Sequence, residues 1–344
     1  MSVWAPGAAS AGRWFAIYLL ILQGAGCAGT QGGSSTAFDA LGWPRDDPRV
    51  RLDTVVGPRR DTSWGNAGFF RRLVGKSAPD LYQHPFGVAW LGDGLLVSDP
   101  DGGRITRIPS TGRVVASASG LFQRPMGIAV CKAGIVVSDA ATGKVALLDS
   151  KLQLVRWLAE GLARPTGVAC SGDRVVVVET GEHRIDVLGP DGNRQSIGRH
   201  GAGPGEFNFP TAVAVDGDSL WVGDTLNFRV QQIDLNSGAF ITAFGQVGDG
   251  AGEMPRIKGI AVDTVGHLWV SDGLLDQVAL YTRSGTFLIA IGARGEEPGE
   301  FSFPTGIAVH ADGRVAVADS LNRRVQVFST VTGEPVWDSS EEQP

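Results

Sequence analysis

The sequence predicts an all-β fold, a six-bladed β-propeller whose blades are four-stranded antiparallel sheets. One apolar phrase recurs six times, at residues 84–90, 124–130, 164–170, 209–215, 256–262 and 303–309. A second apolar run follows each copy and ends in an acid, and these acids are Asp99, Asp139, Glu179, Asp224, Asp272 and Asp319. The repeat length of 40 to 48 residues is typical of solenoids and propellers.

The composition of the apolar runs decides between helix and strand. They are four to six residues long, rich in Val, Ile, Leu and Trp, and bounded by Gly, Asp, Asn or Pro, which indicates strands. In the fourth repeat we expect strands at 212–216, 219–223, 229–234 and 240–244. Four short antiparallel strands make one propeller blade, so six repeats predict six blades around a channel.

The residues before the repeats are expected to close and cap this propeller. Residues 50–56 (VRLDTVV) form an alternating strand pattern, and an unpaired outer strand promotes aggregation, so we expect them to pair with the last blade. Apolar residues within 69–74 group at helical spacing, which favours a short capping helix over the competing strand. The expected organisation is a closing strand and capping segment at 49–79, a propeller at 80–338 and a tail at 339–344.

The first 26 residues are expected to be an export signal. Arg13 is their only charge, and a nine-residue apolar core at 14–22 follows it, too short to span a bilayer comfortably. Small residues then precede Cys27, as in a bacterial lipoprotein signal whose Cys becomes lipidated, although Gly24 stands where an apolar residue is usual. Cleavage of an ordinary signal nearby is the alternative. Residues 27–48 are small and polar and predict a flexible tether from the membrane.

The repeats resemble the NHL-repeat family, whose pattern is P-x-G-I-A-V, a strand ending in Asp, then an Asn and an Arg before a strand such as VQVF. The segments 318–328 (ADSLNRRVQVF) and 223–233 (GDTLNFRVQQI) carry this pattern most fully. With the N-terminal signal, the chain resembles an exported, lipoprotein-like bacterial member. The resemblance implies the propeller over about residues 80–338, but not one function, because the family includes ligases, lyases, RNA binders and partner-binding proteins. The second and fifth repeats depart from the pattern at 141–143 and 275–277, and should lack the Asn–Arg contacts.

Charge and motifs exclude several functions. Without residues 1–26 the chain carries a net charge of −7, and no run of Lys or Arg could follow a phosphate backbone, so no nucleic-acid partner is expected. The sequence contains no G-x-S-x-G, H-E-x-x-H or CxxC motif, and its five His residues share no repeat position. We therefore expect no metal, no cofactor and no catalytic residue of these kinds.

The repeated acids and the remaining cysteines are interpreted as structural. A base stands five residues after five of the six acids, namely Arg104, Lys144, Arg184, Arg229 and Arg324, with Gln277 in the fifth repeat. We expect turn caps and charge pairs within each blade rather than a catalytic set. Cys131 and Cys170 are offset by one residue between neighbouring repeats, which sends successive side chains to opposite strand faces. Export permits a disulfide, but buried free thiols are the favoured expectation.

One repeated position predicts a binding site. Each apolar phrase contains one small residue at a fixed position, and these are Gly87, Gly127, Gly167, Ala212, Gly259 and Gly306. Three residues before them stand His84, Arg124, Arg164, Phe209, Arg256 and Phe303. This position opens each innermost strand, so the six side chains should ring one channel mouth and bind a small anionic ligand or an acidic peptide. The alternative is that the Arg side chains only cover the mouth and pair with nearby acids.

Three long linkers offer a second candidate surface. They span 198–210, 245–257 and 292–304, and loops on a rigid scaffold commonly carry binding residues. The competing interpretation is an ordinary long linker in which Glu206, Glu253 and Glu300 cap loop amides.

The sequence therefore predicts an exported, membrane-tethered binding or scaffold propeller. It would hold a protein partner of the cell envelope, or a small anionic ligand, on one face. The expected location is the periplasmic side of a bacterial membrane through a lipid on Cys27, or else a soluble periplasmic or secreted form. The alternative function is a propeller lyase or hydrolase with a site at the channel mouth.

Overall fold

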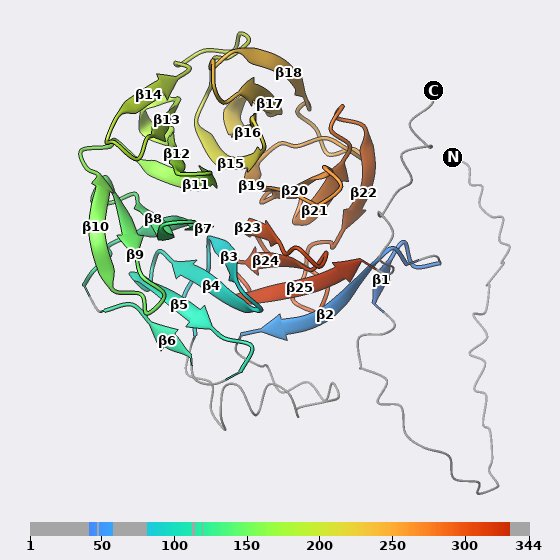
Figure 1. Ribbon diagram of the computed structural model, residues 1–344. Helices are drawn as coiled ribbons and strands as arrows, with labels where there is room; N and C mark the ends of the chain where they lie inside the picture. Colours follow the sequence, from blue (N-terminus) through green and yellow to red (C-terminus); the bar gives the residue numbers. More distant parts are fainter. Residues whose placement is uncertain (1–40, 47, 58–80, 112–113, 119, 331–344) are drawn as a thin grey trace, which may run out of the picture. The chain divides into compact units, whose positions relative to one another are not determined.

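Six β-sheets stand around a central axis, each built as one blade (Figure 1). The computed structural model describes residues 41–330 apart from 47, 58–80, 112–113 and 119. Besides strands, the described residues form two short 3-10 helices, Thr180–Glu182 and Thr225–Asn227. The predicted fold class, an all-β propeller of six blades, is confirmed.

Each blade is a meander in which consecutive strands pair. Blade 1 contains β3 (Val88–Leu91), β4 (Gly94–Asp99), β5 (Arg104–Ile108) and β6 (Val115–Ala116). Blade 2 contains β7 (Pro125–Cys131), β8 (Gly134–Asp139), β9 (Lys144–Leu148) and β10 (Leu154–Ala159). Blade 3 contains β11 (Pro165–Ser171), β12 (Arg174–Glu179), β13 (Arg184–Leu188) and β14 (Arg194–Ile197).

The second half of the chain repeats this order. Blade 4 contains β15 (Pro210–Asp216), β16 (Ser219–Asp224), β17 (Arg229–Asp234) and β18 (Phe240–Phe244), close to the bounds that the sequence predicts. Blade 5 contains β19 (Ile257–Val262), β20 (Leu268–Asp272), β21 (Gln277–Tyr281) and β22 (Phe287–Ile291). Blade 6 contains β23 (Pro304–Val309), β24 (Val315–Asp319) and β25 (Arg324–Thr330), and the N-terminal strands complete it.

The two ends of the described chain close the ring in blade 6. Strand β2 (Val50–Val56) pairs antiparallel with β25, from Val50 opposite Thr330 to Val56 opposite Val325, so the predicted closing strand is confirmed. A further strand, β1 (Gly42–Trp43), pairs with β2. The Trp43 ring lies 5.8 Å from that of Phe328. The expected tether at 27–48 therefore ends earlier than predicted, because its last residues belong to the blade.

The core lies between the blades. Six clusters of buried apolar side chains each draw on two neighbouring blades, including blades 6 and 1. Trp221 of blade 4, for example, packs with Val270 and Tyr281 of blade 5. Every blade thus depends on both neighbours for its burial, which fixes the positions of the strand ends around the channel.

The prediction of free thiols at Cys131 and Cys170 is wrong, because the two residues form a disulfide between blades 2 and 3. Their Cα atoms lie 5.7 Å apart, and both side chains pack on the apolar cluster between these blades. Neighbouring blades pack face to face, so a side chain on one face of β7 meets a side chain on the opposite face of β11. The one-residue offset therefore directs the two sulfur atoms toward each other.

Several predictions lie outside the described residues: the export signal at 1–26, Cys27, the capping helix at 69–74 and the tail at 339–344. Within the described ranges, no helix is both long enough and apolar enough to cross a membrane.

Candidate functional site

The two predicted binding surfaces lie on the same face of the propeller. In five blades the inner strand begins opposite the acid that ends the second strand, as in the pairs Pro125–Asp139, Pro165–Glu179 and Ile257–Asp272. The outer strands also end there, so the long linkers return to the next blade at the same ends. We call this side of the ring the mouth face. It carries the six predicted site residues, the repeated acids and the three long linkers.

The repeated acids hold backbone amides in place, as the structural interpretation expects. Asp139 is buried and its carboxylate accepts hydrogen bonds from the N–H groups of Gln123 (2.7 Å), Arg124 (3.1 Å) and Ala141 (3.0 Å). The equivalent acids bind amides about 16 residues before them in every other blade. Each acid thus fixes the segment that leads into the inner strand, and the backbone N–H groups of that segment occupy the hydrogen-bond acceptors of its carboxylate.

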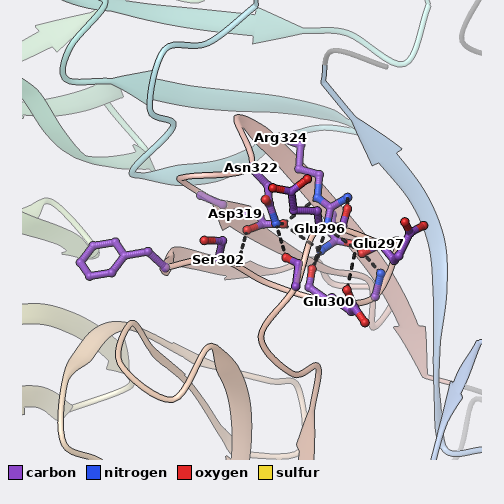
Figure 2. A network of polar contacts seen from close by, with 12 residues as sticks. Glu296, Glu297, Glu300, Ser302, Asp319, Asn322 and Arg324 are labelled. Carbon is purple, nitrogen blue, oxygen red and sulfur yellow. Dashed lines mark hydrogen bonds and ion pairs between the residues drawn. The ribbon is translucent and has the colours of Figure 1, made fainter. Parts of the chain in front are cut away.

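Blade 6 extends this cap into a network that holds linker 292–304 (Figure 2), and equivalent contacts of Asp224 and Arg229 hold linker 198–210 in blade 4. Asp319 accepts hydrogen bonds from Ser302 N (2.8 Å), Asn322 Nδ2 (2.9 Å) and Arg324 Nε (2.6 Å). Arg324 also donates to three backbone carbonyls of linker 292–304, those of Glu296, Glu297 and Glu300. Burial is the main cause that raises the pKa of Asp319.

The glutamates of all three long linkers act as the caps expected of an ordinary linker. The carboxylates of Glu206, Glu253 and Glu300 accept hydrogen bonds from amides three residues earlier, at 3.0, 2.6 and 3.0 Å respectively.

Blades 2 and 5 lack the Asn–Arg contacts, as predicted. Lys144 pairs with Glu160 (2.8 Å) instead of Asp139. Among the described residues, Asp272 accepts hydrogen bonds from backbone amides alone, those of Arg256, Leu274 and Leu275. Of the five blades that carry a base at this position, four therefore form the expected charge pair and blade 2 does not.

Blade 3 buries two acids, Glu179 and Asp186. Arg194 Nη2 lies 2.9 Å from Glu179 Oε2 and 2.5 Å from Asp186 Oδ2, and Arg184 contacts both acids as well. Burial raises the pKa of Glu179, while hydrogen bonds from Glu179 and Arg194 hold the pKa of Asp186 below its usual value despite burial. The two acids are thus held by two arginines and by each other, which makes this pair a structural unit rather than a free acid and base.

Of the predicted site residues, those of blades 1 and 2 are engaged by an acid. His84 Nδ1 lies 2.6 Å from Asp101 Oδ2, and Arg124 Nη1 lies 3.9 Å from Asp101 Oδ1. Asp101 stands two residues after the repeated acid of blade 1. The alternative interpretation, that charged side chains at the mouth pair with nearby acids, therefore holds for these two residues.

The two aromatic residues among the predicted site residues adopt a backbone conformation that the basic ones do not. Phe209 and Phe303 adopt the left-handed conformation, with φ of 48° and 57°. Their N–H groups donate to the preceding blade, to His183 Nδ1 (3.0 Å) and Asp276 Oδ1 (2.7 Å). Arg124 and Arg256 instead donate to the repeated acid of their own blade. The backbone at this position therefore differs between the aromatic and the basic residues, a difference that the repeat alignment does not reveal.

Arg164 and Arg256 are the predicted site residues with free side chains. Both are exposed, and among the described residues no acid lies within ion-pair distance of either guanidinium. A third cation, Lys258, accompanies them. Its pKa is lowered to about 8, first by burial and then by the positive charges of Arg256 and Arg164, while Asp272 acts in the opposite direction. Three cations from blades 3 and 5 thus share the mouth face, and the two arginines act electrostatically on Lys258.

Sequence reasoning missed Lys258, although the repeats contain a signal for it. The residue before the small residue is a threonine in blades 3, 4 and 6: Thr166, Thr211 and Thr305. Thr211 Oγ1, for example, hydrogen-bonds Thr225 Oγ1 (2.7 Å) and the Ile257 carbonyl (3.1 Å) of blade 5. In blade 5 this position is Lys258, and Gly273 replaces the partner threonine.

The glycine makes room for the lysine. A Cβ at Gly273 would lie 3.1 Å from Lys258 Cγ and 3.1 Å from Phe303 Cε2. Lys258 Nζ itself lies 5.4 Å from the centroid of the Phe303 ring.

Exposed leucines lie on the same mouth face as these cations. Leu226, Leu274 and Leu321 are 39, 52 and 56 % exposed. Each stands two residues after a repeated acid, in blades 4, 5 and 6, where blade 1 has Asp101. Phe209 adds a 39 % exposed ring. The mouth face therefore combines an apolar arc over blades 4 to 6 with free positive charge.

Two other features lie away from the mouth face. Asp93, His310 and Asp312 come close enough together to suggest a metal site, but the guanidinium of Arg314 contacts Asp93 (2.9 Å) and Asp312 (2.8 Å). A positive charge already occupies this cluster. A hollow of about 160 Å³ lies between blades 2 and 3, with Arg156 and Arg174 on its wall.

Comparisons with known proteins agree with the fold. The family model described as NHL repeat matches residues 301–328, which lie in blade 6 and its linker. No curated protein sequence gives a significant match.

Among solved structures, a gluconolactonase from Xanthomonas campestris is similar at 18% identity and a TM-score of 0.57, over 81% of this chain and 98% of that one. An inactive variant of virginiamycin B lyase from Staphylococcus aureus, solved with quinupristin, is similar at 15% identity and a TM-score of 0.55, over 72% of this chain and 95% of that one. A nidogen/laminin complex is similar at 14% identity and a TM-score of 0.53, over 70% and 88%. Enzymes and a binding protein thus share the fold, and at these identities the likeness shows the fold alone.

Proposed function

The chain is a six-bladed β-propeller that carries an NHL repeat, and from this premise we propose that it is a binding propeller whose mouth face holds an anionic group of a ligand or protein partner. The observation that carries the proposal is the pair Arg164 and Arg256, whose guanidinium groups have no acid partner among the described residues. Guanidinium groups match carboxylate and phosphate by paired hydrogen bonds. Repulsion among Arg164, Arg256 and Lys258 is relieved when an anion binds between them.

The apolar arc supports a partner that has both an anionic and an apolar part. Leu226, Leu274 and Leu321 are exposed on the mouth face that also carries the cations, and large exposed apolar side chains gathered on one face indicate an interaction surface. Burying such side chains contributes about 25 cal/mol per Å² of apolar area. An acidic peptide with apolar residues, or an amphipathic acid, fits both halves of the face.

Export and lipid anchoring through Cys27 remain part of the proposal. The disulfide between Cys131 and Cys170 supports an oxidising compartment, because disulfides persist outside the cytosol. The proposed site of action is the periplasmic side of a bacterial membrane.

A titration with the amphipathic anion 8-anilinonaphthalene-1-sulfonate tests the binding proposal. Fluorescence should report saturable binding to the folded protein. Arg164→Ala/Arg256→Ala should weaken it by roughly 1.5–3 kcal/mol for each charged hydrogen bond lost, and the difference should shrink at high salt.

The matched control is Arg156→Ala/Arg174→Ala, which removes two charges at the hollow between blades 2 and 3 and leaves the mouth face intact. Weakening in the control but not in the mouth variant would overturn the proposal. Both variants should melt within a few degrees of the wild type, which separates lost binding from lost folding.

A further inference from the structure

We propose that Lys258 is a nucleophilic amine that captures an anionic carbonyl compound at the mouth face as an imine, while Arg164 and Arg256 hold the anion. The inference rests on the proposed function, since it uses the same cations, and it goes further by naming the ligand's reactive group. It starts from an anomaly in the repeats. Lys258 occupies the position where three blades place an interblade threonine.

The surroundings of Lys258 keep its amine free to react. Among the described residues no carboxylate forms an ion pair with Nζ, and its described neighbour is the Phe303 ring, 5.4 Å away. The other lysines of the described chain differ. Lys132 pairs with Asp173 (3.1 Å), Lys144 pairs with Glu160 (2.8 Å), and Lys151 lies exposed in a turn.

The charges that face Lys258 favour the neutral amine. Burial is the largest cause that lowers the pKa of Lys258, and the positive charges of Arg256, at the start of the same strand, and of Arg164, in blade 3, lower it further. Asp272 of β20 is the one acid acting on it, and its carboxylate is already used by three backbone amides. A pKa of about 8 leaves on the order of a hundredfold more free amine at neutral pH than an ordinary lysine has.

The chemical step balances without any redox partner. The Nζ lone pair attacks the carbonyl carbon, the carbonyl π electrons move to oxygen, and a proton passes from nitrogen to that oxygen to give a carbinolamine. Loss of water then forms the C=N bond, so one molecule of water leaves for each imine.

A carboxylate or phosphate on the carbonyl compound supplies the selectivity. The guanidinium groups of Arg164 and Arg256 bind such a group and hold the carbonyl carbon near Nζ. The ligand class is therefore a small aldehyde or ketone that also carries an acid group.

Reductive trapping tests the proposal on the purified protein. Glyoxylate with cyanoborohydride at neutral pH converts each imine into a stable secondary amine, and the hydride comes from the reagent. The chain has five lysines, Lys76, Lys132, Lys144, Lys151 and Lys258, so peptide mass spectrometry can follow every one. Lys258 should react at least about tenfold faster than the internal reference Lys151, and acetaldehyde, which has no acid group, should show a smaller preference.

The arginine variant separates the two parts of the proposal. In Arg164→Ala/Arg256→Ala the pKa of Lys258 should rise, so both aldehydes should react more slowly. The ratio of the glyoxylate rate to the acetaldehyde rate should also fall, and this ratio reports anion holding alone. Arg156→Ala/Arg174→Ala should leave both rates and their ratio unchanged.

Two outcomes would overturn the proposal, and they can be distinguished. Equal reaction of Lys258 and Lys151 in a protein that still binds the anilinonaphthalene sulfonate at the mouth would disprove the imine and leave the binding function standing. Fast reaction of Lys258 with no preference for glyoxylate would disprove capture of an anion and would contradict the proposed function as well.

Discussion

Lys258 Nζ of blade 5 lies 5.4 Å from the ring centroid of Phe303 in blade 6, so a cation and an aromatic face meet across an interblade boundary at the mouth. A ring face attracts a cation, yet it replaces the hydration of an ammonium group only in part. The same position in blade 2 holds Met126, and those in blades 3, 4 and 6 hold threonines. The fold therefore does not require a charge there, and a partly buried charge at this position lowers the stability of the fold.

Replacing this lysine should stabilise the protein in a pH-dependent way. Lys258→Met copies the residue of blade 2 and removes a partly buried charge. Because the folded-state pKa is lowered to about 8 from 10.5, the charged lysine destabilises the fold at pH values below 8. Allowing for its partial exposure to solvent, the variant should gain about 1–2 kcal/mol at pH 7.

The pH range is the diagnostic part of this prediction. The unfolded chain binds more protons than the folded one between pH 8 and 10.5, so the wild type should gain stability across that window and the variant's advantage should vanish. Urea unfolding at several pH values measures this. A variant less stable than the wild type at pH 7 would show that Lys258 stabilises the fold.

Arg324 should be among the most stabilising side chains of the linker network. Its Nε lies 2.6 Å from Asp319 and its other nitrogens bind three linker carbonyls, with the side chain only 8 % exposed. Arg324→Ala leaves a buried carboxylate unpaired, so we expect a loss of about 3–5 kcal/mol. The loss should shrink at acid pH, because burial already raises the pKa of Asp319 and protonation removes its charge.

Arg199 provides the control for this measurement. It pairs with Glu206 at a similar distance, 2.7 Å, but its side chain is 81 % exposed. Arg199→Ala should cost about 0–1 kcal/mol. Equal losses in the two variants would contradict the assignment of a clamp to Arg324.

Strand β2 should be needed for a stable ring. Deleting residues 49–58 removes the buried Val50, Leu52 and Val56 and leaves the edge of β25 unpaired. The melting temperature should fall by about 10 °C or more, as calorimetry can measure. An unchanged melting curve would show that blade 6 does not need this closure.

The proposed lipid anchor on Cys27 predicts where the protein is found in the cell. Cys27→Ala should move it from the membrane fraction to the soluble envelope fraction. Because one acyl chain binds a membrane only weakly, the lipidated cysteine should carry two or three chains. A wild-type protein that fractionates as soluble would disprove the anchor and leave ordinary secretion.

Much of the fold could be predicted because the repeat is visible in the sequence. Six copies of the repeat, with acids at nearly constant spacing, predict six blades. The alternating strand pattern of residues 50–56 predicts the closing strand. The disulfide between Cys131 and Cys170 was not predicted, because the one-residue offset places two side chains on opposite faces only when both strands belong to one sheet. The disulfide joins two sheets that face each other.

The candidate site could be predicted only in part. The repeat position identified Arg164 and Arg256, but it could not show that Asp101 engages His84 and Arg124, since that acid belongs to a different position of blade 1. Lys258 was missed because its environment depends on Gly273 and Phe303, which lie 15 and 45 residues further along the chain.

A crystal structure of the protein with bound 8-anilinonaphthalene-1-sulfonate tests the central claim most directly. The account predicts the sulfonate within hydrogen-bond distance of the Arg164 and Arg256 guanidinium groups, with the aromatic rings against Leu274. A sulfonate found instead at Arg156 and Arg174, in the hollow between blades 2 and 3, would contradict the assignment of the mouth face as the binding site.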